Sequence, residues 1–532
     1  MAGFSREEGV EKTGAEDTEK DGNCSRVQDI VMERSAVGED AAEGRVDEDR
    51  NNLKNSGDDD AVEEKEEENQ VKKKKKKKKK KNNKKKKKKK NTGGLAVSAL
   101  DGEAYAVRHT EGKGRGCFAK GNFSAGHEII VEKAYAYTSL SGRGPRCCSV
   151  CYSSSAKLLG CDACKGVWYC SENCKNVLLP AHKAYCAATA KVAGISKSTG
   201  VEQTFLELML LALTWKECSP IVEEGKSLRR MGWNEVALMP SLQRSEESHD
   251  ALRLAANAVC VDCPENEEEC FDILCKINTN SHSVSSFAEP PHGVGLFPLV
   301  ALCNHSCDPN CIYFQGPEEG SMIVRTLRPV KNGEELCVSY IDGMLPRKQR
   351  RSILQETKGF LCSCARCSAE LNESSKDFFL TAMAKGYNDK QHGKIKARAE
   401  AQVTNLMATL GSLESPEQRE RAKKAIASSV LHPRHYLLLE CRVAVMNALT
   451  RQGDYAGASK LCAEIIECQD ACLSRHAQET LRYVKWHVEL LSKQLSSTKR
   501  RLPPKLTKKI LRDRDTSEER VSWTQRIFLF EE

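Results

Sequence analysis

The sequence lacks any run of about 18 apolar residues, the length that a helix needs to cross a bilayer. It also lacks an N-terminal segment with the basic, then apolar, then small-residue order of a signal peptide. We therefore expect no membrane association and a location in the nucleus, the cytoplasm or both. Aromatic residues are scarce, at 6%, and residues 1–94 contain almost none. We expect that segment to be disordered, because it can bury too little apolar area to offset its ordering entropy.

Most of the chain also lacks an excess of positive charge, although the formal net charge is +9. Two runs, Lys72–Lys81 and Lys84–Lys90, supply ten and seven lysines, so the remainder is negative. Phosphate binding needs a cationic surface, so nucleic acid is not an expected partner except through this lysine-rich tail. The lysine runs predict either nuclear import or a segment that only stays solvated, and the sequence leaves both open.

Cysteine, in contrast, is abundant, with 26 residues. In a reducing compartment, clustered cysteines indicate metal ligands rather than disulfides. Structural zinc takes four thiolate or imidazole ligands, so eight ligands predict two zinc sites that are filled by protein. The eight form four consecutive pairs: Cys148 and Cys151, Cys161 and Cys164, Cys170 and Cys174, and His182 and Cys186.

Two further cysteine groups lie outside that segment. Cys362-x-Cys364-x2-Cys367 offers three ligands, and Cys307 would supply the fourth, so a third zinc ion would join two distant segments. A last group has irregular spacing and predicts either another metal site or small buried core residues. It consists of Cys260, Cys263, Cys270 and Cys275.

Hydrophobic periodicity predicts an α+β fold. Alternating patterns predict short strands at 105–107, 116–119, 128–131, 296–302, 311–314, 322–327 and 336–341. Helical patterns occur at 205–215 and, in the C-terminal part, at 436–449, 457–472 and 479–495. The last thirty residues are rich in Lys and Arg, and we expect them to form a loosely attached tail.

Four motifs resemble the catalytic domain of SET-domain lysine methyltransferases. They are Gly112–Ala119, Gly293–Pro298, Asn304–Asn310 and Gly333–Asp342. The ligand pairs at 148–186 resemble a MYND zinc module, which implies one ion on Cys148, Cys151, Cys170 and Cys174 and another on Cys161, Cys164, His182 and Cys186. A SET domain that is split by a MYND module resembles the SET and MYND domain-containing (SMYD) family of protein-lysine methyltransferases.

The resemblance implies an architecture in which SET strands surround a threaded C-terminal segment as a pseudoknot. It implies eight parts: a disordered acidic and poly-lysine tail (1–94), the N-terminal SET part (95–146), the MYND zinc module (147–186), a helical SET insert (187–260), the SET catalytic core (261–345), a post-SET zinc segment (346–370), a tetratricopeptide-like helical domain (371–495) and a basic tail (496–532). The MYND module would bind a proline-containing peptide or serve only as architecture.

The same resemblance implies transfer of a methyl group from S-adenosylmethionine to lysines of histones or other proteins, by a monomer that carries three structural zinc ions. Tyr340 would orient the lysine amine and the methyl group in a narrow channel. The residues implied to bind the cofactor are Gly114, Arg115, Gly116, Asn280, Asn304, His305 and Phe360; the alternative for Phe360 is an ordinary core residue. Lys358 and Ala301 depart from the family, which often has an aromatic and a small hydroxyl residue there.

The main alternative is a scaffold whose degenerate SET fold only supports the MYND module and the helical domain, for example in transcription. A scaffold has no physical need of Tyr340, Asn304 and His305 together. Their joint presence favours the enzyme.

Overall fold

The fold is taken from a computed structural model, which describes residues 100–110, 112–140, 146–154, 157–218, 229–241, 246–287, 289–387, 389–410, 415–474, 476–497 and 502–529. The segment predicted to be disordered (1–94), with both lysine runs, lies outside the described residues. None of the helices in those ranges is both long and apolar enough to cross a membrane.

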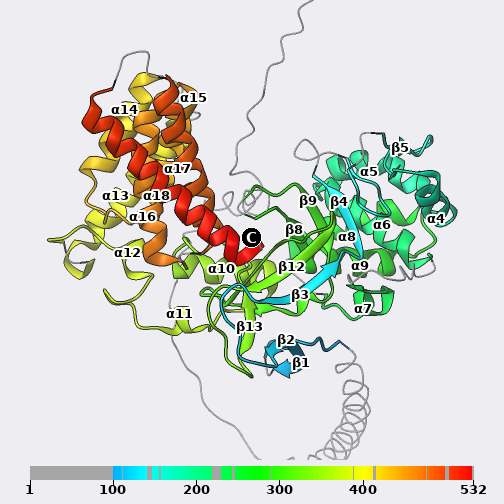
Figure 1. Cartoon of the computed structure of the whole chain (residues 1–532). Coiled ribbons are helices and arrows are strands. Elements are labelled where there is room, and N and C mark those ends of the chain that lie inside the picture. The colour runs from blue at the N-terminus through cyan, green and yellow to red at the C-terminus, as the bar shows by residue number, and fades with distance from the viewer. Residues whose placement is uncertain are drawn as a thin grey trace, which may run out of the picture. The chain divides into compact units, whose positions relative to one another are not determined.

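Short, mostly antiparallel strands form small sheets (Figure 1). The strand orders are β1-β2-β13-β10, β11-β12-β3-β7, β4-β9-β8 and β5-β6. β10 runs parallel to β13, which brings two of the motifs in the sequence side by side. In chain order the strands are β1 (Tyr105–Thr110), β2 (Gly114–Ala119), β3 (Glu128–Lys133), β4 (Ala136–Ser139), β5 (Leu159–Gly160), β6 (Trp168–Tyr169), β7 (Arg229–Arg230), β8 (Ser281–Val284), β9 (Gly293–Leu296), β10 (Asn304–His305), β11 (Cys311–Gln315), β12 (Ser321–Thr326) and β13 (Glu335–Val338).

The predicted strand at 296–302 is wrong beyond Leu296. β9 ends there, and Val300–Leu302 form a 3-10 helix, η1. The carboxylate of Glu132 on β3 is fully buried and accepts hydrogen bonds from the backbone N–H groups of Leu299 and Val300, each at 3.0 Å. The Glu132 carboxylate thereby satisfies the backbone N–H groups at the start of η1, which have no partner within the helix. A strand pattern cannot reveal this, because Glu132 lies 167 residues before Leu299.

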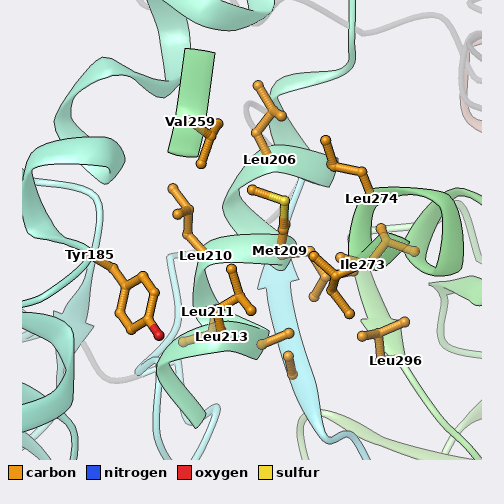
Figure 2. Packing of buried hydrophobic residues seen from close by; sticks show 14 of the residues in the cluster. Tyr185, Leu206, Met209, Leu210, Leu211, Leu213, Val259, Ile273, Leu274 and Leu296 are labelled. Atoms are coloured by element: carbon orange, nitrogen blue, oxygen red, sulfur yellow. The ribbon is translucent and has the colours of Figure 1, made fainter. Parts of the chain in front are cut away.

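A helical segment between β6 and β8 shares an apolar core with β4 and β9. The predicted helix at 205–215 is confirmed as α6, which is apolar on nearly every side and is therefore buried. Figure 2 shows its Leu206, Met209 and Leu210 among side chains of the neighbouring helices, including Val259 and Leu274. The helices are α4 (Glu172–His182), α5 (Cys186–Thr199), α6 (Gln203–Lys216), α7 (Trp233–Ala237), α8 (Glu246–Cys260) and α9 (Glu267–Asn280).

The C-terminal part is helical, as predicted, and α15 to α18 pack in sequence (Figure 1). Asp454 caps α16 by accepting from the Gly457 N–H at 3.0 Å, and Gly453 turns the chain with φ +78°. The helices are α10 (Arg347–Lys358), α11 (Ala365–Ser368), α12 (Phe378–Thr381), α13 (Asp389–Leu410), α14 (Pro416–Ser428), α15 (Tyr436–Arg451), α16 (Tyr455–Cys472), α17 (Gln478–Ser497) and α18 (Pro504–Leu529).

The expected loose tail is wrong for the described residues 502–529. They form α18, which packs on α17 and buries Ile510 and Phe528. The Phe528 ring stacks on Phe287 with 5.5 Å between centroids, in a cluster that also includes Phe314 of β11. The apolar residues of α18 are widely spaced among charges, so its buried side could not be found from the sequence. This contact attaches the C-terminal helices to the strands.

A buried charge network joins α10 to the segment that follows α11. Both oxygens of Asp377 bind the guanidinium of Arg350, at 2.9 and 2.7 Å, and Oδ1 also accepts from Arg366 at 2.6 Å. All three side chains are at least 93% buried. Burial opposes the charged form of Asp377, but the hydrogen bond from Arg350 and the charges of both arginines hold its pKa below the usual value. The carboxylate thus compensates two buried cations.

We predict that Asp377→Asn lowers the free energy of unfolding by about 3–5 kcal/mol, because it leaves two buried guanidinium groups without their counter-charge. Urea unfolding of the full chain measures this loss. Asp272→Asn is the matched control, since Asp272 is 53% exposed and pairs with Lys276 at 2.7 Å. A pair whose carboxylate faces solvent contributes less than about 1 kcal/mol. Equal losses in the two variants would contradict the prediction.

Candidate active site and metal centres

The eight ligand residues at 148–186 come together in two sets. Within each set the four ligand atoms lie within 4.8 Å of one another. Cys151 and Cys170 have their sulfur atoms 3.4 Å apart, close to the roughly 3.8 Å edge of a tetrahedron with 2.3 Å zinc–sulfur bonds. One set is Cys148, Cys151, Cys170 and Cys174, and the other is Cys161, Cys164, His182 and Cys186. The sets alternate along the chain, as the MYND resemblance implies.

A third set joins segments that are far apart in the sequence. Cys307 follows β10, and its sulfur lies 3.9 Å from that of Cys362 and 3.5 Å from that of Cys367. Cys364, at the N-terminus of α11, completes the set. The donors fit zinc in each of the three sets, because four thiolate or imidazole ligands surround a closed position.

The remaining cysteine group forms no such set. Among the described residues, no cluster of metal-ligating groups includes Cys260, Cys263, Cys270 or Cys275. Cys270 and Cys275 lie on the buried side of α9 and belong to the core around α6. The structure therefore agrees with the alternative that they are small core residues.

The glycine motif packs against the Asn304–His305 strand. A Cβ on Gly116 would lie 2.7 Å from Nδ2 of Asn304 and 3.1 Å from Oε1 of Glu335, so only glycine fits between them. The Asn304 amide donates to Glu335 at 2.9 Å and to the Arg115 carbonyl at 3.3 Å. Gly114, in turn, has φ +79°. The motif thus holds its backbone close to β10 and β13.

Tyr340 and His305 are connected through the backbone. The Tyr340 N–H donates to Nδ1 of His305 at 3.0 Å, so the ring proton of the neutral imidazole is on Nε2, which faces the Cys307 sulfur at 3.2 Å. Burial lowers the pKa of His305 to about 4, which keeps the ring neutral. The Tyr340 hydroxyl donates to the Cys303 carbonyl at 2.7 Å. Burial raises the pKa of this hydroxyl.

Phe360 lies beside this group, and Asn280 is held by other contacts. The Phe360 ring is 6.1 Å from that of His305, centroid to centroid. The Asn280 amide donates to the carbonyls of Pro240 and Lys276, at 2.8 and 2.7 Å. The preceding carbonyl, that of Thr279, accepts from the Lys358 ammonium at 2.7 Å, and this connects the end of α9 to the surroundings of Tyr340.

Sequence reasoning did not assign roles to two groups of this site. Glu335 holds both the Asn304 amide and, at 2.7 Å, the ammonium of Lys113. The position of Glu335 in the motif Gly333-Glu-Glu-Leu indicates a carboxylate with a partner at the site. The Cys303 carbonyl that accepts from Tyr340 gives no signal in the sequence, since a backbone acceptor has no residue type.

The site lies within a segment that matches a known family. Residues 114–341 match the SET domain family. This part of the chain is thus similar to a SET domain, and the predicted site residues from Gly114 to Tyr340 lie inside the match.

Several curated proteins are similar to this chain over about half of its length. The chain is 27% identical over 276 residues to Histone-lysine N-methyltransferase SMYD3 of Mus musculus, which covers 49% of this chain and 60% of that protein. It is 30% identical over 270 residues to SET domain and MYND-type zinc finger protein 6 of Schizosaccharomyces pombe (50% and 52%). It is 27% identical over 277 residues to Histone-lysine N-methyltransferase ASHR1 of Arabidopsis thaliana (51% and 56%).

The match spans little more than half the length of these relatives. The SET match and these relatives support the resemblance to the SMYD family that the motifs predicted.

Proposed function

We propose that this protein is an S-adenosylmethionine-dependent protein-lysine N-methyltransferase that acts on lysines of histones or other proteins. The observation that carries the proposal is the connection of Tyr340 through His305 to the strand that packs on the glycine motif. In that arrangement the Tyr340 hydroxyl, which donates to the Cys303 carbonyl, lies next to the backbone of the glycine motif, the proposed cofactor site. The names of the relatives, which describe histone-lysine and N-lysine methyltransferases, support the same reaction.

The proposed cofactor site is the cradle formed by the glycine motif, Asn304–His305 and Phe360. S-adenosylmethionine supplies an electrophilic methyl group on a sulfonium. The proposed binding residues are Gly114, Arg115, Gly116, Asn280, Asn304, His305 and Phe360. Glycine backbone approaches closely because it lacks Cβ, while amide groups and an aromatic face suit an amino acid and an adenine respectively.

The chain's own contribution to the reaction is orientation and charge. The Tyr340 hydroxyl already donates to the Cys303 carbonyl, so its oxygen can accept a hydrogen bond from an incoming amine and align it. Burial raises the pKa of Tyr340, which keeps the hydroxyl protonated at physiological pH. Tyr340 therefore orients the amine and does not act as the base.

We also propose the finer architecture that the family resemblance implies. This comprises three structural zinc ions, a MYND module at 147–186, a SET pseudoknot, and a tetratricopeptide-like domain at 371–495. The alternating cysteine sets and the parallel pairing of β10 with β13 support the first three. A proline-containing peptide at the MYND module, a monomeric state and a nuclear or cytoplasmic location complete the proposal.

Tyr340→Phe should lower kcat at least 100-fold, because it removes the hydroxyl that aligns the amine. The measurement is transfer of labelled methyl from S-adenosylmethionine to core histones and to a cell extract. Tyr135→Phe is the matched control, since its buried hydroxyl also donates to a backbone carbonyl, that of Ala212, but in the core around α6. Label that persists on the same lysines in Tyr340→Phe would refute this role.

Cofactor binding should weaken at least tenfold in Gly116→Ala, because the new Cβ displaces the Asn304 amide. Calorimetric titration with S-adenosylmethionine measures this. Gly393→Ala is the control, since a Cβ at Gly393 in α13 meets nothing within 4 Å. An unchanged dissociation constant in Gly116→Ala would place the cofactor elsewhere.

The purified protein should contain three zinc ions per chain. Cys307→Ser should lose one of them, because it opens the site that Cys362, Cys364 and Cys367 complete. Cys260→Ser should keep all three, since Cys260 belongs to none of the ligand sets. Elemental analysis by plasma mass spectrometry gives the counts. Loss of zinc from the Cys260 variant would show that the assignment is wrong.

A further inference from the structure

A lysine side chain lies beside the proposed catalytic tyrosine. Lys358 is the last residue of α10, and its ammonium lies 5.7 Å from the centroid of the Tyr340 ring. The same ammonium donates to the Thr279 carbonyl at 2.7 Å. Thr279 is in the last turn of α9. The charged end of Lys358 is therefore held at one place by contacts with two separate elements.

The surroundings stabilise a cation at that place. The carbonyl ends of helices carry partial negative charge, and Lys358 both ends α10 and binds a carbonyl in the last turn of α9. The faces of aromatic rings also attract cations, and the Tyr340 ring is within the distance at which this attraction acts. These contacts surround the Lys358 ammonium with partial negative charge.

The imidazole and phenol side chains around this cation are uncharged at physiological pH. Burial, and after it the charge of Lys358, lower the pKa of His282 on β8 to about 3. Burial raises the pKa of Tyr340 and raises that of Tyr313 on β11 to about 12. From α17, Glu479 also acts on Tyr313, and burial raises the pKa of Glu479. Lys358 is thus a fixed positive charge beside Tyr340, whose ring is neutral, as are the rings of Tyr313 and His282.

Resting on the proposed methyl transfer, we propose that the Lys358 ammonium disfavours the protonated form of the target lysine and so delivers it to Tyr340 as the neutral, nucleophilic amine. A like charge nearby disfavours a second cation, and the ammonium of the substrate must lose its proton before nitrogen can bond to carbon. The proton goes to solvent before transfer. The carbon–sulfur bond then breaks as the nitrogen–carbon bond forms, and the electron pair stays on sulfur.

The charge of Lys358 sets the direction in which the pH dependence of the reaction shifts. A positive neighbour lowers the pKa of the bound substrate amine, so the reactive form is populated at lower pH than it would be beside a neutral side chain. Removing the charge raises that pKa, and activity at neutral pH falls while activity at high pH is retained. An arginine at the same position keeps the charge and should keep the profile.

The pH dependence of kcat tests this, with Lys358→Met and Lys358→Gln as neutral variants and Lys358→Arg as the charged control. The substrate is the histone or extract lysine that the wild-type enzyme labels. We expect the acid limb to move to higher pH by about one pH unit in both neutral variants and to stay in place in the arginine variant. Acid limbs that coincide in all four proteins would overturn the proposal.

A second measurement needs no turnover. A peptide that contains the labelled lysine is bound to the full chain with S-adenosylhomocysteine, and calorimetry in two buffers of different ionisation enthalpy counts the protons released. Wild type and Lys358→Arg should release more protons at pH 8 than the neutral variants. Equal proton release overturns the role of Lys358 even where rates differ. Absence of any labelled lysine in wild type would instead overturn the proposed function itself, and this inference with it.

Discussion

The closure of Cys307 onto the 362–367 segment is the constraint on which the geometry of the site depends. Cys307 lies two residues after His305, and His305 holds the Tyr340 backbone. A metal on the third cysteine set would therefore fix three things at once: the end of β10, the strand exit that carries Tyr340, and the segment that carries Phe360. A loop of this kind has little regular structure of its own, so a metal here would replace the missing ladder of hydrogen bonds.

Charge balance extends this constraint into the helical part of the chain. Four thiolates around one divalent ion would carry a net negative charge, and Arg350 approaches the sulfur of one of these residues, Cys367, at 3.6 Å. Arg366 donates to the Cys307 carbonyl at 3.0 Å. Asp377 then compensates both arginines just before α12. The cysteine set, α10 and the start of the helical region thus form one electrostatic unit, in which each charge is buried because its neighbour is present.

The sequence could predict those features of the structure that depend on local spacing or strong periodicity. The cysteine pairs, the strands near the glycine motif and the helices around Tyr436 and Tyr455 all have signals within a few residues. Glu132 accepts from the backbone of residue 299, which lies 167 residues later, and this contact turns 299–302 away from a strand. Asp377 pairs with Arg350, 27 residues earlier. Separations of this size exceed the windows in which sequence patterns are recognised. The burial of α18 depends on Phe287 and Phe314, which lie more than two hundred residues earlier. Such contacts belong to the folded topology and not to any local pattern.

In the proposed methyl transfer, the arrangement around Tyr340 also limits where the proton of a substrate lysine can go. The hydroxyl donates to the Cys303 carbonyl, and burial raises its pKa, so it stays protonated and cannot take another proton. His305 accepts from the Tyr340 backbone at Nδ1 and turns its other nitrogen toward Cys307, so it has no acceptor left for the amine. Because neither Tyr340 nor His305 serves as a base in the proposed reaction, we expect the amine to arrive already neutral. A fixed cation such as Lys358 favours that outcome without taking part in the proton transfer, and the same charge disfavours binding of the ammonium form. Rate at neutral pH is then gained at the expense of affinity for the protonated substrate, which is the form that dominates in solution.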